Sequence, residues 1–232
     1  AIVEGLLDAF AESGLSGGSI SEVLHATTVA SNAILEQKGV RTGLITTKGF
    51  RDSIEMAQEN RFEQYDIFIE KPEPLVPRTL RFTVPERVDA KGGVRLALDE
   101  SAVEALAGTL AAKGVEEVAV GFLHSYANPA HERRAGEILA KKLPGVRISL
   151  SCDVCPEVRE YERFSTTCAN AYVQPLMGRY LESLRRRIAQ AGFACPISLP
   201  AGTGSWPPFP AVPARRSATG RPACCTGTAR PA

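Results

Sequence analysis

The densest group of reactive side chains lies between residues 156 and 170. Three carboxylates and two arginines fall within seven residues there, and three hydroxyls and an amide follow. Such a cluster can orient a polar substrate and neutralise charge that develops on it. A solvated charged turn is the alternative, but hydroxyls that run into an otherwise apolar helix weaken it. The candidate residues are Glu157, Arg159, Glu160, Arg163, Ser165, Thr166, Thr167 and Asn170.

A second candidate site lies at the start of a helical pattern, where Thr27 and Thr28 precede Asn32. Hydroxyls and backbone N–H groups at a helix start can hold an anion, because unpaired donors and the helix dipole both point there. The simpler interpretation is that Thr27 or Thr28 only caps the helix.

A third candidate combines arginines with carboxylates. Arg51 and Asp52 are followed by Glu55 and then by Arg61. Arginine binds phosphate or carboxylate groups through paired hydrogen bonds. Surface ion pairing is the commoner alternative and stabilises a protein little.

The fourth polar segment, residues 123–132, follows an expected strand, where ligands of open α/β sheets tend to bind. His124 and His131 could act as acids, bases or metal ligands. Asn128 and Pro129 are explained by helix initiation, however, and His131 falls in the first turn. A structural role is therefore favoured for this segment.

Cys152 and Cys155 form a CxxC pair. No second CxxC and no nearby pair of histidines completes a tetrahedral metal site, so we expect reduced thiols and no metal. The sequence also lacks a Walker A loop, a GxGxxG fingerprint and a GxSxG elbow. The residues alone therefore indicate an α/β domain with a polar cleft.

Alternating helical and strand patterns position these segments. Helical and strand patterns that alternate along the chain, with short connections between them, predict an α/β layer with parallel pairing. Gly39 is expected to end the second helix in a left-handed conformation, and Ser101 and Glu104 are expected to begin the third as a capping box. The helical patterns cover residues 2–12, 28–38, 101–114, 128–143 and 165–191, the last kinked near Pro175, while strands are expected at 42–46, 115–122 and 146–150 and a hairpin at 81–88 and 94–98.

Composition restricts the class of protein. The formal net charge of +1 and the absence of a clustered basic face argue against nucleic-acid binding. No apolar run reaches the roughly 18 residues of a membrane span, and no secretory signal is visible, so a cytoplasmic protein is expected. Residues 200–232 follow no periodicity and contain no Asp, Glu or Lys. They are interpreted as a disordered or, preferably, a frame-shifted tail after a domain at 1–199.

Several segments together resemble the N-terminal domain of the hydantoinase A/5-oxoprolinase family. The resemblance rests on His25–Asp52, Lys71–Arg78, Val84–Arg87, Phe122–Glu132 and Pro156–Thr167, and it continues through Asn170–Pro175. Five ordered motifs at family-like spacing cover roughly residues 1 to 199.

The resemblance implies a part of an actin-like, ribonuclease-H-type ATPase fold, with helices on a mixed, mainly parallel sheet. It also implies cytoplasmic enzymes that use ATP and Mg²⁺ to open 5-oxoproline, hydantoin or N-methylhydantoin rings, together with a hydantoinase B-type partner subunit. ATP would phosphorylate the amide oxygen so that water can attack the ring. The threonines and Asn32 would then line the cleft, and the arginines and the 159–170 cluster would contact substrate or phosphate.

Three departures from the family pattern lead us to expect an incomplete and inactive piece. The family's Asp-Ile-Gly-Gly-Thr-Phe-Thr-Asp-like phosphate hairpin does not precede Ala1, Ala26 stands where the family has glycine, and no second ATPase half follows Leu199. Two alternatives stay open: the related subunit of an ATP-dependent ketone carboxylase, and a non-catalytic interaction module that docks through residues 157–163. Which ring is the substrate is not determined by these residues.

Overall fold

Four parallel strands form the central sheet. The computed structural model describes residues 2–14, 23–58, 65–68, 72–192 and 197–198. The strands are β2 (Thr42–Thr47), β3 (Arg81–Val84), β6 (Glu117–Gly121) and β7 (Arg147–Leu150), in the order β3-β2-β6-β7. β2 and β6 are buried along their whole length, because each has a strand on both sides and helices above and below. This sheet confirms the predicted α/β layer with parallel pairing.

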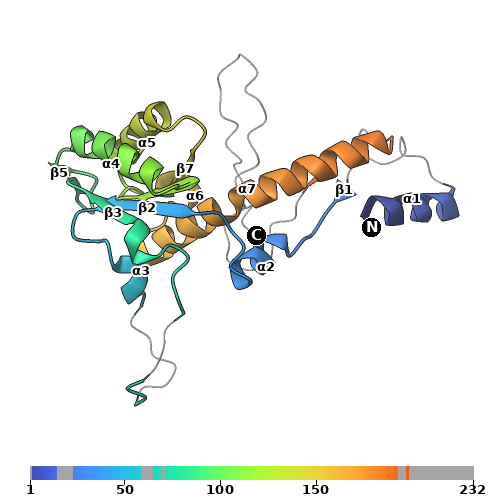
Figure 1. The fold of residues 1–232 in the computed structure, drawn as a ribbon, viewed down its shortest axis with the longest axis horizontal. Coiled ribbons are helices and arrows are strands. Elements are labelled where there is room, and N and C mark those ends of the chain that lie inside the picture. The colour runs from blue at the N-terminus through green and yellow to red at the C-terminus, as the bar shows by residue number, and fades with distance from the viewer. Residues whose placement is uncertain (1, 15–22, 59–64, 69–71, 193–196, 199–232) are drawn as a thin grey trace, which may run out of the picture.

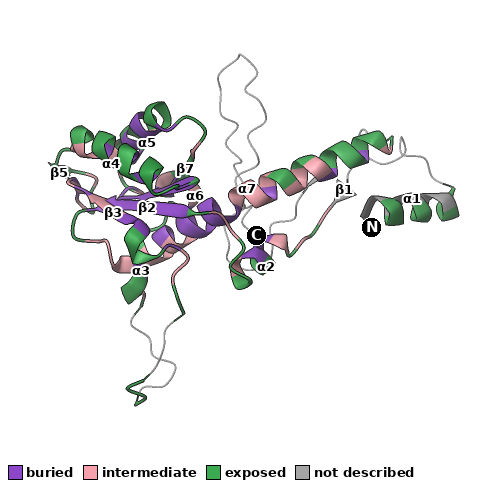
Figure 2. Cartoon of the chain, viewed as in Figure 1, coloured by how far each residue is buried: buried purple, intermediate pink, exposed green. Residues whose placement is uncertain are grey.

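Helices cover both faces of this sheet. α4 (Glu100–Ala112) and α5 (Ala130–Lys142) lie on one face, whereas α7 (Glu160–Gln190) and the short α3 (Ser53–Met56) lie on the other (Figure 1). α6 (Ser151–Val154) leads from β7 toward α7. The two central strands and the inward sides of the helices are buried, and the outer sides of α4 and α5 are exposed (Figure 2). The core contains Leu44, Val120, Leu110, Leu139 and Phe164.

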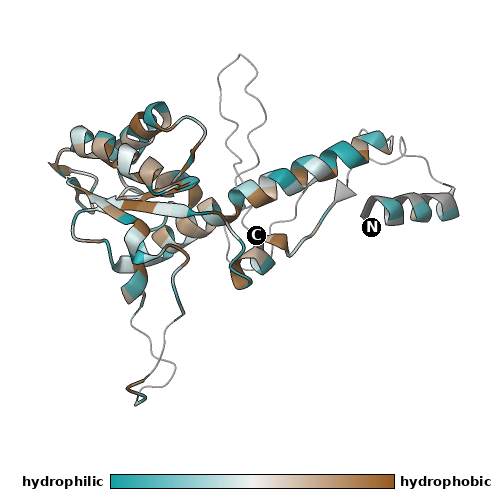
Figure 3. Cartoon of the chain, viewed as in Figure 1, coloured by the Kyte–Doolittle hydropathy of each residue, from teal (hydrophilic) through white to brown (hydrophobic). Residues whose placement is uncertain are grey.

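α7 extends well beyond the sheet (Figure 1). α2 (Val29–Leu35) packs beside its middle through a second small core of Ala30, Ala33, Tyr172, Val173 and Met177. Farther along, α7 is largely hydrophilic (Figure 3), in keeping with the run Arg185–Arg187. α1 (Ile2–Ser13) lies toward this distal end, and β1 (Val23–Leu24) pairs in parallel with β8 (Ile197–Ser198).

The predicted hairpin is only partly correct. β3 forms no hairpin arm, because it joins the main sheet beside β2. Only β4 (Arg87–Val88) pairs in an antiparallel manner with β5 (Val94–Leu96). A local alternation of side chains predicts a strand but says nothing about a partner that is distant in the sequence.

The prediction for Gly39 is also wrong. The second helix ends at Leu35, and the left-handed residue after it is Gln37, with φ of 52°. Gly39 is needed for close packing instead, because an added Cβ would lie 2.1 Å from the Tyr172 ring. The approach to α7, rather than backbone conformation, therefore accounts for this glycine.

Two helix starts differ from the expectation. Asp99 caps α4 in place of Ser101: its Oδ1 accepts hydrogen bonds from the Ala102 N–H at 3.0 Å and from the Ser101 hydroxyl at 2.6 Å. α7 begins at Glu160 rather than residue 165, and Pro175 lies within it. Acidic residues in its first turn favour this earlier start, because they complement the helix dipole. A 3-10 turn (η2, Arg78–Leu80) precedes β3.

Some predictions fall on residues outside the described ranges. The tail at 200–232 and Arg61 belong to this group. Within the described part of the chain, none of the helices combines the length and the apolar character that crossing a bilayer requires.

Candidate functional site

Polar residues follow the strands at the carboxyl edge of the parallel sheet. Thr47 ends β2, Glu86 comes two residues after β3, and Ser151 comes directly after β7. All three are buried. Open α/β sheets bind their ligands at this edge. These positions therefore define the first candidate site, which we call the carboxyl-edge network.

Glu132 organises one half of the carboxyl-edge network. It lies in the first turn of α5 and is fully buried. Its Oε1 accepts hydrogen bonds from the Phe122 N–H at 2.7 Å and the Ser151 hydroxyl at 2.6 Å, and its Oε2 accepts from the Cys152 N–H at 2.8 Å. One carboxylate thus joins the ends of β6 and β7 to the start of α5.

Arg163 completes this half from α7. Its Nε donates to the Ser151 hydroxyl at 3.1 Å, its Nη1 to the Glu157 carbonyl at 2.8 Å and its Nη2 to the Phe122 carbonyl at 2.7 Å. Burial lowers the pKa of Arg163, and the charge of Glu132 opposes that effect. Because the guanidinium is buried and bonded on all three nitrogens, it positions the loops of this edge.

Thr47, Glu86 and His131 form the other half. The Leu123 N–H donates to Thr47 Oγ1 at 3.0 Å, and the Thr47 hydroxyl donates to Glu86 Oε1. Glu86 Oε2 lies 2.8 Å from His131 Nδ1. The Glu86 side chain has no exposed surface, whereas the His131 side chain is 12% exposed. The buried carboxylate therefore holds an imidazole that reaches the surface.

The cluster predicted at 157–170 is divided by the fold. Glu157, Arg159 and Glu160 are exposed. By contrast, Thr167 Oγ1 donates to the Arg163 carbonyl at 2.6 Å and Asn170 Nδ2 to Ser149 Oγ at 3.0 Å, both in the interior.

The remaining hydroxyls of this cluster occupy other sides of α7. Thr166 opposes the rise that burial causes in the pKa of the Cys155 thiol, and the Ser165 hydroxyl donates to the Glu162 carbonyl at 3.2 Å. Contact of any member of the 157–170 cluster with substrate stays a prediction.

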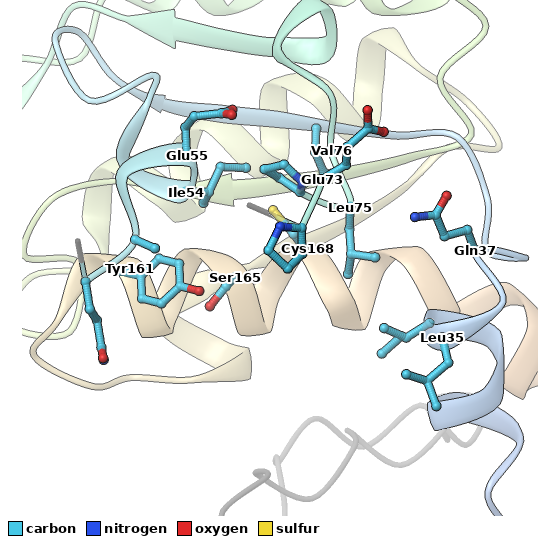
Figure 4. A pocket seen from close by; sticks show the side chains of 15 residues that line it. Leu35, Gln37, Ile54, Glu55, Glu73, Leu75, Val76, Tyr161, Ser165 and Cys168 are labelled. Carbon is cyan, nitrogen blue, oxygen red and sulfur yellow. The ribbon is translucent and has the colours of Figure 1, made fainter. Parts of the chain in front are cut away.

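A cavity of about 560 Å³ lies beside α7 (Figure 4). Tyr161, Ser165 and Cys168 face this cavity. The side chains two positions after them are Arg163, Thr167 and Asn170. Two residues correspond to about 200° around a helix, so these three lie on the opposite side of α7 from the cavity. The ends of α2 and α3 and residues 72–76 supply the other walls. Its size suits a small ligand, and most of its lining is apolar.

Arg51 and Asp52 are bonded to neighbouring protein groups. Arg51 Nη2 donates to the Arg78 carbonyl at 2.7 Å. Arg78 donates to both carboxylate oxygens of Asp52, at 2.9 and 3.1 Å, and these bonds lower the pKa of Asp52. Behind them, the buried Arg81 pairs with Glu55 at 2.7 Å. Ion pairs thus account for Asp52 and Glu55, whereas Arg51 bonds a carbonyl and leaves its buried Nε without a hydrogen-bond partner. A substrate role for this segment stays a prediction.

The threonine segment lies at the start of α2. Thr27 Oγ1 accepts a hydrogen bond from the Val29 N–H at 3.3 Å, whereas Thr28 makes no capping bond with its side chain. The Thr28 and Asn32 side chains are exposed. α2 has only seven residues and packs away from the carboxyl edge, so anion binding at its start stays a prediction.

The cysteines of the CxxC pair are free thiols. Burial raises the pKa of both Cys152 and Cys155, which disfavours the reactive thiolate. Across the described ranges, no group of three His, Cys, Asp or Glu side chains is arranged to hold a metal ion.

Sequence reasoning missed four residues of the network: Thr47, Glu86, Glu132 and Ser151. A usable signal existed, because Thr47 and Ser151 mark the ends of apolar strands, and Glu86 and Glu132 lie within the motifs 84–87 and 122–132. In a parallel sheet, ligand-binding side chains can follow every strand, and not only the strand before the 123–132 segment.

Comparisons with known proteins agree on one family. The hydantoinase/oxoprolinase N-terminal region matches residues 1–143. The alpha subunit of caprolactamase from Pseudomonas jessenii is 37% identical over 73% of this chain and 25% of its own length. The 5-oxoprolinase of Saccharomyces cerevisiae is 31% identical over 75% of this chain and 15% of its own length.

Solved structures show the same relationship. The ATP-dependent caprolactamase of Pseudomonas jessenii matches with a TM-score of 0.78 and 35% identity, over 86% of this chain and 30% of that one. A nucleotide-free acetone carboxylase matches with a TM-score of 0.70 and 26% identity, over 79% and 28%. The α/β architecture is thus that of these enzymes and is consistent with an actin-like ATPase-type fold.

The chain spans less than a third of the length of each of these relatives. The family match is nevertheless broad within the chain itself, because residues 1–143 include β2, β3, β6 and the start of α5. The chain belongs to the hydantoinase/oxoprolinase N-terminal family.

Proposed function

We propose that this chain is part of an ATP-dependent enzyme that hydrolyses cyclic amides of the lactam, 5-oxoproline or hydantoin type. The observation that carries the proposal is the carboxyl-edge network, in a chain whose relatives include a caprolactamase and a 5-oxoprolinase. Glu86, His131 and Arg163 come from three separate family-like motifs, and the fold brings those motifs to one edge of the sheet. Groups that meet at this edge can orient a substrate and move protons.

ATP and Mg²⁺ are proposed to bind in the longer enzyme rather than in the cavity or at the carboxyl edge. The charged side chains that line the cavity are Glu55 and Glu73, and carboxylates repel a triphosphate. At the carboxyl edge, the Arg163 donors are already used by protein groups. These residues do not fit a nucleotide, so no phosphoryl-transfer step is assigned to them.

A partner subunit of the hydantoinase B type is also proposed. The start of α7 exposes Glu157, Arg159 and Glu160, and Val158 is 67% exposed among them. An apolar residue surrounded by charges of both signs suits a polar interface with one anchoring contact. If this face is only a docking surface, Arg159→Ala weakens assembly with the partner and leaves turnover of the assembled enzyme unchanged.

The decisive experiment uses the complete enzyme, with its partner subunit, and measures ADP release for each candidate substrate. We expect release that depends on a cyclic amide and is accompanied by the ring-opened product. Release that depends on a ketone and bicarbonate would establish the carboxylase alternative, which the similarity to acetone carboxylase favours. Equal release with and without every substrate would refute both.

The cavity beside α7 offers a second location for the ring, and a variant pair tests it. Ser165→Phe places a large side chain in the cavity, whereas Ser183→Phe makes the same change farther along the helix. If the ring binds in the cavity, kcat/KM falls at least about tenfold, or about 1.4 kcal/mol, for Ser165→Phe alone. Equal values for the two folded variants leave the carboxyl edge as the site.

A further inference from the structure

The contact between Glu86 and His131 has the geometry of an oriented acid–base pair. The two side chains come from the loop after β3 and from the first turn of α5, and they are 45 residues apart in the sequence. Their atoms Oε2 and Nδ1 lie 2.8 Å apart. From the sequence, His131 could be an acid or a base but its segment favoured a structural role, and Glu86 was not a candidate.

The hydrogen bonds around Glu86 have a definite direction. Thr47 Oγ1 accepts from the Leu123 N–H, so its single proton is free for Glu86 Oε1. Glu86 is therefore an acceptor on that oxygen, and its other oxygen is left for His131. A carboxylate that accepts from Nδ1–H leaves the lone pair of the neutral imidazole on Nε2.

Because Glu86 is buried and His131 is partly exposed, the exposure of the pair indicates which ring nitrogen a ligand can reach. Glu86 has no exposed side-chain surface, whereas the His131 side chain is 12% exposed. Among the described residues, Glu86 is the polar partner of the His131 ring. The nitrogen that faces away from Glu86 is thus the one available to a ligand at the carboxyl edge.

From this geometry we propose that His131 is a catalytic acid–base residue at the carboxyl edge and that Glu86 is the residue that positions it. The proposal rests on the proposed hydrolysis of a cyclic amide. Nε2 takes a proton from water as the water oxygen bonds to the carbonyl carbon and the C=O π pair moves onto the carbonyl oxygen. As this pair re-forms the C=O bond, the ring C–N bond breaks, and Nε2 returns the proton to the ring nitrogen, which becomes the amine of the opened chain. The histidine ends in its original state, and Thr47 and Glu86 keep the ring oriented.

A purely structural pair would tie α5 to the loop after β3 and do nothing else. His131→Asn separates the two roles, because the Asn amide can still donate to Glu86 but has no group at the Nε2 position. His25→Asn is the matched control, since His25 lies beside Tyr180 of α7, away from the edge. Both variants are made in the complete enzyme.

We expect His131→Asn to retain the unfolding midpoint of the wild type and to lose at least 100-fold in kcat, within the range of general acid–base catalysis. His25→Asn should remain within about threefold. Added imidazole should restore part of the rate in His131→Ala, because a free base can occupy the space. A folded His131→Asn enzyme with wild-type kcat overturns the inference, although the proposed function would stand.

A spectroscopic test on the 232-residue chain does not depend on turnover. Long-range ¹H–¹⁵N correlation should show the His131 proton on Nδ1 when the ring is neutral, and Glu86→Gln should abolish that preference. A proton on Nε2 in the wild type would overturn the inference. If the complete wild-type enzyme hydrolyses no cyclic amide, the proposed function fails, and this spectrum alone then decides whether the oriented base exists.

Discussion

Both ends of the central sheet bury a glutamate, but the two carboxylates differ in their hydrogen bonding. At the carboxyl edge, Glu132 accepts hydrogen bonds from two backbone N–H groups and a hydroxyl. At the amino edge, Glu117 begins β6 with 2% exposure and leaves Oε2 without a hydrogen-bond partner. Burial raises the pKa of Glu117 to about 7, and the charge of Arg147, its neighbour on β7, opposes that rise.

The difference follows from the direction of parallel strands and their helices. Helices begin at the carboxyl edge, so their free N–H groups point toward any acceptor there, as Cys152 of α6 does toward Glu132. α4 ends just before β6, and a helix end presents carbonyl oxygens, which cannot donate to a carboxylate. One end of the sheet is therefore suited to a functional anion, and the other end makes a buried carboxylate unfavourable.

The largest effect is expected when the carboxyl edge loses its buried arginine, Arg163. Arg163→Met leaves the Phe122 and Glu157 carbonyls without their donor and Glu132 without a nearby positive charge. We expect the free energy of unfolding, measured with urea, to fall by about 3–5 kcal/mol.

Arg159→Met is the control, because this exposed arginine lies one turn earlier. It should change the free energy of unfolding by no more than about 0.5 kcal/mol. Similar midpoints for both variants would show that the network does not stabilise the edge.

A smaller loss is expected for Glu132→Gln. The amide replaces one acceptor oxygen by a donor, which then faces an N–H or a hydroxyl proton. The free energy of unfolding should fall by about 1–3 kcal/mol, whereas the exposed Glu137→Gln on the same helix should have little effect. A Glu132→Gln protein as stable as the wild type would contradict the contrast between the two edges.

Unlike the two substitutions at the carboxyl edge, Glu117→Gln should raise the free energy of unfolding at high pH. The pKa of Glu117 is about 7 in the folded protein against an ordinary value of 4.5, so the native state binds more protons between these values. Stability from this group is present below pH 4.5 and is lost as the pH rises through 7. Glu117→Gln should therefore raise the free energy of unfolding at pH 8 by on the order of 2 kcal/mol and change it little at pH 5.

Urea titrations of the Glu117→Gln and wild-type proteins at the two pH values measure this effect. The exposed Glu182→Gln on α7 serves as control and should keep the pH dependence of the wild type. An unchanged pH dependence in Glu117→Gln would mean that the buried carboxylate is paired in solution.

Sequence reasoning reached the layers of the fold but only part of the candidate site. Strands 42–46 and 146–150 were predictable, because runs of apolar and β-branched residues between turns have few other structures available. Arg163 was named as a candidate contact for substrate or phosphate, a role that stays a prediction, and its burial was not foreseen. A sequence of seven mostly charged residues gives no sign that one of them is buried. The direction in which each side chain leaves the helix decides this, and it depends on how the helix packs on the sheet.

By itself, the sequence determined the α/β alternation, the parallel pairing and the family, because periodicity and motif spacing are local properties of the chain. Tertiary structure alone decided that β3 joins the main sheet, that Gly39 meets Tyr172, and that Glu86 and His131 meet across 45 residues. Such contacts depend on how whole elements pack, and a hydrogen bond between distant segments leaves no periodic trace in either of them.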